Sequence, residues 1–111
     1  MLQNFSGYSG DDFQQKFNVG GSLSGVTVFW SLYEQLFGVP SGSPILVKTS
    51  QSGGGIEVMN SPPSFTISFE AADTSSLQGN YYHEARVVSE SGNIITEVQG
   101  ILTVNATEPV P

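Results

Sequence analysis

The sequence contains no cysteine and few basic side chains, and each shortage excludes a class of protein. Without cysteine the chain has no disulfide, no thiolate metal site and no cysteine nucleophile. Ten acidic residues face three basic ones, so the formal net charge is -7. The bases Lys16, Lys48 and Arg86 are spread out along the chain. Nucleic acids and anionic membrane surfaces are bound by clustered positive charge, so we expect neither as a partner.

Long hydrophobic runs are also missing. No apolar stretch approaches the roughly 18 residues that a membrane span requires, so no transmembrane segment is expected. Residues 1–7 show neither the basic region nor the apolar region of a secretory signal peptide, so we expect a soluble protein made in a cytoplasm. The length of 111 residues fits a single domain.

Groups that catalyse reactions are scarce. His83 is the only histidine, and a packed strand position is favoured over a catalytic base, because the sequence places no nucleophile beside it. The chain has no Gly-x-Ser-x-Gly elbow, and the glycines at 53–55 lack the lysine of a phosphate loop, which favours a flexible hairpin. Asp11 and Asp12 would point to opposite faces of a strand, without calcium-loop spacing. We therefore expect no enzyme activity, no cofactor and no metal site.

Apolar residues recur along the chain with a period of two. In residues 64–70, Phe65, Ile67 and Phe69 share one face while polar residues occupy the other, as in a strand with one buried side. Strands are expected at residues 13–19, 26–34, 45–49, 56–59, 64–70, 81–88 and 94–104. Turns rich in glycine, serine and proline separate them. The pattern predicts an all-β fold, a seven-stranded antiparallel sandwich with Greek-key connections.

One connection between the predicted strands differs from the others. Residues 71–79 do not alternate, and they predict a single helical turn that Asp73 caps and Gly79 ends. Such a turn would cross from one sheet to the other. Tyr81 follows directly, in an arrangement that looks like the tyrosine corner of immunoglobulin-like sandwiches.

The last two strands allow finer predictions. Glu84 and Arg86 are two residues apart on one strand face, which suits a surface ion pair. In the final strand, Ile94 is expected on the same face as Val98, with Gly100 as a bulge or bend. The ends lack alternation. The predicted organisation is an N-terminal arm at 1–10, the sandwich at 11–104 and a C-terminal tail at 105–111.

Several bulky apolar residues fall outside the predicted core. Some lie on the second face of the strand at 26–34, some in the expected long loop 35–44, and some in the arm. Neighbouring loops or a second layer could cover them, or they could form a protein–protein interface, where aromatic anchors are favoured. Both interpretations stay open here. The candidate interface residues are Leu2, Phe5, Tyr8, Phe29, Tyr33, Leu36, Phe37 and Val39.

The order and spacing of several short motifs resemble those of a family of small immunoglobulin-like modules in tailed bacteriophages. The resemblance extends over roughly residues 10–105. The motifs, in chain order, are Gly10-Asp11-Asp12-Phe13, Ser22-Leu23-Ser24-Gly25-Val26-Thr27, residues 65–77 (FTISFEAADTSSL), residues 79–88 (GNYYHEARVV), Ser91-Gly92-Asn93 and Gly100-Ile101-Leu102-Thr103-Val104.

The resemblance implies a virion protein, assembled in the bacterial host cytoplasm, whose partners are phage structural proteins. Such modules occur at the N-terminus of baseplate or fibre-bearing proteins and as stand-alone head or tail proteins. Because no fibre domain follows Val104, we expect a capsid decoration, or cement, protein that bridges shell subunits by binding the major capsid protein, with a homo-oligomer also open. One alternative is a tail, neck or baseplate adapter. A second is a cell-surface or carbohydrate-binding sandwich.

Overall fold

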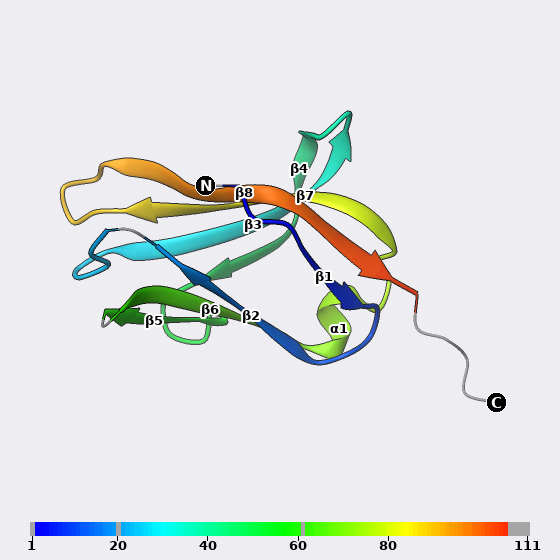
Figure 1. Cartoon of the computed structure of the whole chain (residues 1–111), viewed down its shortest axis with the longest axis horizontal. Helices are drawn as coiled ribbons and strands as arrows, with labels where there is room; N and C mark the ends of the chain where they lie inside the picture. The colour runs from blue at the N-terminus through cyan, green and yellow to red at the C-terminus, as the bar shows by residue number, and fades with distance from the viewer. Residues whose placement is uncertain (1, 20, 61, 107–111) are drawn as a thin grey trace.

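The computed structural model describes residues 2–19, 21–60 and 62–106, which form strands and one short helix (Figure 1). The strands are β1 (Phe5–Tyr8), β2 (Phe13–Asn18), β3 (Thr27–Leu36), β4 (Val39–Thr49), β5 (Ile56–Asn60), β6 (Pro63–Phe69), β7 (Gly79–Val88) and β8 (Ile94–Asn105), and the helix is α1 (Ala71–Thr74). They build two stacked sheets. The large sheet has the order β1-β8-β7-β3-β4 and the small sheet has the order β2-β6-β5.

The strand order is that of an immunoglobulin-like sandwich. β2, β6 and β5 correspond to strands B, E and D of that fold, while β3, β7 and β8 correspond to C, F and G, and β4 extends the second sheet as in variable-type domains. The tyrosine corner is present, because the Tyr81 hydroxyl donates to the Gln78 carbonyl and accepts from the Gln78 N–H, each at 3.1 Å. Trp30 on β3 is fully buried, as in that fold. The predicted fold class is confirmed.

The structure has eight strands where seven were expected, because residues 1–10 are not simply an arm. β1 pairs with β8 in parallel, and Phe5 lies opposite Leu102. The prediction of a long loop at 35–44 is also wrong, because β3 and β4 continue into a hairpin whose turn is Phe37-Gly38. At the other end, Asn105 completes β8 and residues 107–111 of the predicted tail lie outside the described residues, as does Met1.

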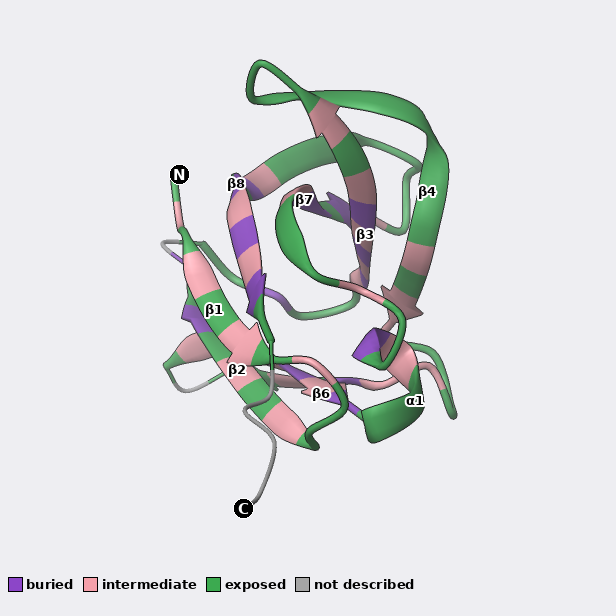
Figure 2. Ribbon diagram, turned by 90° about the vertical axis from the view of Figure 1, so that its right-hand side faces the viewer, coloured by how far each residue is buried: buried purple, intermediate pink, exposed green. Residues whose placement is uncertain are grey.

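The core lies between the two sheets and contains the predicted alternating residues (Figure 2). The large sheet contributes alternate residues of β3, β7 and β8, and the small sheet contributes its inward aromatic residues. The buried apolar residues are Phe17, Val19, Leu23, Val28, Trp30, Leu32, Ile56, Phe65, Ile67, Phe69, Ala85, Val87, Val98, Leu102 and Val104. β4 is exposed from Val39 to Ile45, whereas Leu46, Lys48 and Thr49 near its end are partly buried.

His83 is a buried polar group in this core, and both ring nitrogens are bonded. It lies two residues after Tyr81, where antibody domains carry the second cysteine of their inter-sheet disulfide. Here its ring stacks on Phe17 of the small sheet at 5.8 Å between ring centroids. Nδ1 accepts a hydrogen bond from the Trp30 indole at 3.1 Å, so Nε2 carries the proton that is donated to the Gln3 carbonyl at 2.6 Å. The preference for a packed histidine is confirmed.

The N-terminal segment runs over β8 at very short range. The Gln3 N–H donates to the Gln99 carbonyl, and the Asn4 side chain accepts from the Ile101 N–H. The closest approach is at Gly100, where an added Cβ would lie 2.3 Å from the Gln3 carbonyl oxygen. Gly100 pairs regularly with His83 in the β7–β8 ladder, so it is not the bulge that its position suggested. It allows the Gln3 carbonyl to reach the histidine.

The bulge in β8 comes earlier in the strand. Ala85 pairs with Val98 and Arg86 pairs with Thr96, so Glu97 is the extra residue. An extra residue reverses the alternation that precedes it. Ile94 therefore faces away from the core, and the expectation that it shares the face of Val98 was wrong.

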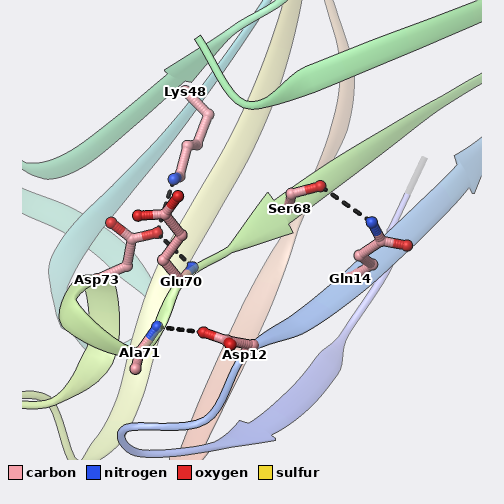
Figure 3. Close-up of polar contacts among 7 residues, drawn as sticks. All are labelled: Asp12, Gln14, Lys48, Ser68, Glu70, Ala71 and Asp73. Atoms are coloured by element: carbon pink, nitrogen blue, oxygen red, sulfur yellow. Dashed lines mark hydrogen bonds and ion pairs between the residues drawn. The ribbon is translucent and has the colours of Figure 1, made fainter. Parts of the chain in front are cut away.

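The crossover from β6 to β7 contains the predicted helical turn, with different capping residues (Figure 3). Asp73 is the third helical residue rather than the N-cap, and its carboxylate accepts from the Glu70 N–H at 2.8 Å. The helix ends at Thr74, before Gly79. The Asp12 carboxylate accepts from the Ala71 N–H at 2.7 Å, which ties the start of β2 to this turn.

An ion pair fastens the same turn to β4. Lys48 Nζ lies 2.7 Å from Asp73 Oδ2, and both side chains are largely buried. Burial alone would raise the pKa of Asp73, but hydrogen bonds from Lys48 and from the Glu70 N–H, together with the lysine charge, outweigh burial and lower the pKa below 3.8. The carboxylate is therefore charged at neutral pH, and the pair holds the edge strand β4 against the crossover.

We predict that Gly100→Ala destabilises the fold by about 2 kcal/mol, in the range typical of an overpacked site. The new methyl group would displace the Gln3 backbone and break its bond to His83. Urea unfolding should show a lower midpoint. Gly21→Ala is the control, because a Cβ at Gly21 meets no atom within 4 Å. Equal midpoints for the two variants would contradict this account of Gly100.

We also predict that stability falls as the pH drops from about 6.5 to 4. Burial lowers the pKa of His83 to about 4, and the bond to the Gln3 carbonyl only partly opposes this shift. The unfolded chain takes up the proton near pH 6.5 and the folded chain does not, so acid favours unfolding by about 3 kcal/mol across this window. Denaturant unfolding at a series of pH values tests this. His83→Leu should be less stable at pH 7 and should lose this part of the pH dependence.

Candidate interaction surface

The large sheet turns one face away from the core, here called the outer face. Trp30 and Leu32 point inward from β3, so the alternate residues of that strand and the residues paired with them point outward. The residues that pairing places on the outer face are Thr27, Phe29, Ser31 and Tyr33 of β3, Val47 and Thr49 of β4, Tyr82, Glu84, Arg86 and Val88 of β7, and Ile94, Thr96, Gln99 and Ile101 of β8. Most are apolar or uncharged.

The outer face is electrically neutral although the chain is strongly acidic. Among the described residues that strand pairing places there, Glu84 and Arg86 are the charged ones, and they form the predicted ion pair at 3.2 Å. The pair has no net charge. The formal charge of -7 therefore comes entirely from other residues of the sequence.

Two apolar hollows lie on this face, one on each side of a tyrosine pair. Tyr33 and Tyr82 contact each other with ring centroids 6.1 Å apart. Burial and the nearby Glu84 carboxylate raise the pKa of Tyr82, so its hydroxyl remains a donor at neutral pH. The first hollow, called the Phe29 hollow, has a volume of about 300 Å³ and is lined by Phe29, Ser31, Tyr33, Glu84, Arg86, Val88 and Ile94. The second, of similar volume, is lined by Leu2, Gly38, Val39, Pro40, Tyr82, Gln99, Gly100 and Ile101.

The hairpin of β3 and β4 ends in an apolar tip. Leu36, Phe37 and Val39 are 59%, 95% and 57% exposed. The register jumps between Leu32 and Glu34, with extra residues in β4, and Figure 1 shows the hairpin projecting from the large sheet on the side away from the small sheet. The tip therefore stands clear of the molecule, on the same side as the outer face.

The turn at the tip holds an aromatic residue in an unfavourable backbone conformation. Phe37 has φ of 54° and Gly38 has φ of 81°, as in a two-residue type I′ turn. Among the described residues, Phe37 is the one non-glycine residue with positive φ. Asparagine, aspartate or glycine normally takes this position. The Gln35 side chain accepts from the Gly38 N–H at 2.6 Å and holds the turn in shape.

The structure brings most of the sequence-predicted interface residues together. Leu2 and Val39 line the same hollow, Phe29 and Tyr33 line the other, and Leu36 and Phe37 form the tip beside them. Two predicted residues lie elsewhere. Phe5 packs into the core, with its ring 4.9 Å from that of His83. Tyr8 lies at the far end of β1, opposite Asn105.

Sequence reasoning missed part of the surface. Tyr82 and Val88 were placed on the outward phase of their strand but were not chosen as candidates. Alternation alone would have identified them once the core face was known. Ile94 was assigned to the wrong face because the bulge at Glu97 has no clear sequence signal. Ile101 lies after the bulge, and alternation with the inward Leu102 would have placed it on the outer face.

Other types of site find little support in the described parts of the chain. Within residues 2–19, 21–60 and 62–106 no group of three or more histidine or acidic side chains could hold a metal ion. No helix of this part is long and apolar enough to cross a membrane. An open hollow beside α1 is lined by Asp12, Gln14, Ser68 and Glu70, among others. Asp12 already caps the helix, and Gln14 donates to Ser68, as Figure 3 shows.

Comparison with known proteins adds little to these observations. No family model matches the chain, and no curated protein matches it. Among solved structures it is similar to the amphioxus IgVJ-C2 molecule, at 15% sequence identity and a TM-score of 0.32. The match covers 89% of this chain and 54% of that chain, so the present chain spans about half its length. The immunoglobulin-like fold class rests on the strand order, the tyrosine corner and the buried tryptophan.

We predict that Phe37→Asn raises the stability of the isolated chain by about 1 kcal/mol. Asparagine tolerates the positive φ of the turn, whereas a bulky side chain there is strained by about this amount. Urea unfolding at low protein concentration measures the change. Val39→Asn serves as the control, because it removes a similarly exposed apolar group from a position with ordinary φ. A less stable Phe37→Asn variant would show that the turn is not strained.

Proposed function

We propose that the chain is a non-enzymatic structural protein of a tailed-bacteriophage virion and acts as a capsid decoration protein. The virion assignment is supported by the motif order described above, and the fold is compatible with it. The mode of action is protein binding through the outer face and the hairpin tip. A decoration protein that bridges neighbouring shell subunits stabilises the assembled shell by mass action, repeated over many copies.

One observation carries the binding role: a surface with two apolar hollows and no net charge on a chain with a net charge of -7. Small soluble domains rarely leave such a patch uncovered unless a partner covers it. Phe37 strengthens the case, because its 95% exposure to water and its strained backbone both lower the stability of the isolated chain. Aromatic side chains at the centre of an interface commonly carry much of its binding energy.

A tail, neck or baseplate adapter would use the same surface with fewer copies. Copy number therefore separates the two locations, since a shell offers many equivalent seams and a symmetric junction offers few.

The test is cosedimentation of the purified chain with phage particles that lack it, with copies counted by gel densitometry. We expect hundreds of copies on the heads. Phe37→Asn should weaken binding about tenfold or more, as for an interface hot spot. Met59→Asn is the matched control, because Met59 is 47% exposed on the small sheet, away from the outer face.

A handful of copies per particle would move the protein to the tail, neck or baseplate. No binding at all would exclude the virion role. Equal binding by Phe37→Asn and the wild-type chain would place the particle contact on another surface.

A further inference from the structure

We propose that the outer face binds a second copy of this chain in an antiparallel, two-fold symmetric pair, with the Phe37 tip of each copy seated in the Phe29 hollow of the other. This inference rests on the proposed role of the outer face as a protein interface. The pair and the particle contact use the same surface, so the pair is a state of the free chain and must dissociate before the chain binds a particle.

Charge favours this face for self-association. Two copies with a net charge of -7 repel each other wherever their acidic surfaces meet. The outer face reduces this cost, because Glu84 and Arg86 neutralise each other there and Glu34 is the one acidic residue of the hairpin strands. In an antiparallel pair, the Arg86 guanidinium of one copy can also approach the incoming phenyl ring of the other, which is a favourable cation–π arrangement.

The spacing along β3 makes the face self-complementary. Phe29 and Phe37 lie four residues before and four residues after Tyr33, so they lie on opposite sides of the tyrosine pair, with Phe37 at the end of the hairpin that projects from the sheet. A two-fold axis near the Tyr33–Tyr82 pair therefore brings the tip of one copy over the hollow of the other. The same rotation makes both contacts at once, so the assembly closes with two chains and does not grow into a filament.

The hollow suits an aromatic side chain. Its volume of about 300 Å³ exceeds the roughly 150 Å³ that accommodates a benzene molecule in a protein core. Phe29, Val88 and Ile94 supply apolar walls. Ile94 is 61% exposed in the single chain, so a seated ring would cover an apolar group that is otherwise in water.

The size of the face suits a weak dimer. The seven residues of β3 that also pair with β7, at about 3.3 Å each and across four strands about 4.8 Å apart, give a flat area of roughly 440 Å². The projecting hairpin adds to this area. Standard interfaces bury about 800 Å² on each partner.

The first experiment measures the mass of the full-length chain by sedimentation equilibrium up to about 1 mM. We expect a dimer, twice the 11.8 kDa of one chain, that dissociates on dilution. Phe37→Asn should raise the dissociation constant at least about tenfold while remaining folded, and Met59→Asn should leave it unchanged. A monomer at all concentrations would overturn the pair, as would a Phe37→Asn variant that dimerises like the wild type.

The second experiment tests the geometry by using the natural absence of cysteine. Equal amounts of Phe37→Cys and Ile94→Cys chains are mixed and oxidised. A disulfide needs Cα atoms within about 7 Å, so a mixed dimer of the two variants requires a tip seated in a hollow. Within one chain the two sites lie at opposite ends of β3 and cannot join. We expect the mixed dimer in excess over either homodimer.

An excess of the disulfide homodimer of the Phe37→Cys chain would overturn the tip-in-hollow arrangement. Met59→Cys mixed with Ile94→Cys measures random collision, and a mixed dimer no more abundant than in this control would also overturn it. Particle binding is scored separately, so the virion role and the pair can fail independently.

Discussion

The sandwich depends on one buried histidine whose two nitrogens connect three parts of the chain. His83 lies where antibody domains place a disulfide cysteine, and it stacks on Phe17 of the opposite sheet. Its hydrogen bonds reach Trp30 on the neighbouring strand and Gln3 in the N-terminal segment. A chain without cysteine thus joins its sheets by ring packing and closes one edge by a hydrogen bond. The bond from Trp30 requires the neutral ring, because a proton on Nδ1 would face the Trp30 N–H, whereas the bond from Nε2 to the Gln3 carbonyl can form in either protonation state.

Alternation and turn residues were sufficient to predict the interior of the fold. The faces of β6 and β7, the crossover turn and the tyrosine corner all depend on local spacing, which sequence displays directly. The errors arose where a distant contact decides the local structure. β1 exists because Asn4 and Gln3 bond to residues nearly a whole chain length away, at Ile101 and Gln99. No local pattern in residues 1–10 signals that pairing.

The candidate surface could be predicted only in part, for a similar reason. Phe29 and Tyr33 were recognisable as too apolar for a solvated face, and Phe37 as too apolar for a loop. Their assembly into one surface needs the β3–β4 hairpin, which the glycine and the two prolines of residues 39–44 obscured. Ile94 lies on the outer face because of the extra residue at Glu97. One inserted residue moves the side chains that precede it to the opposite face of the sheet.

The division of charge on the molecule follows from the same architecture. The inner face of the large sheet is filled by core residues, whereas the outer face is open to a partner and its one charged pair among the described residues has no net charge. The acidic surplus lies elsewhere in the chain, where it opposes non-specific association. The strained turn at Phe37 is consistent with a surface that binds a partner. A backbone cost of about 1 kcal/mol at Phe37 is less than the roughly 2 kcal/mol gained by burying one phenyl ring, so binding can offset it. The tip is therefore unfavourable in the free chain and favourable only when a partner covers it.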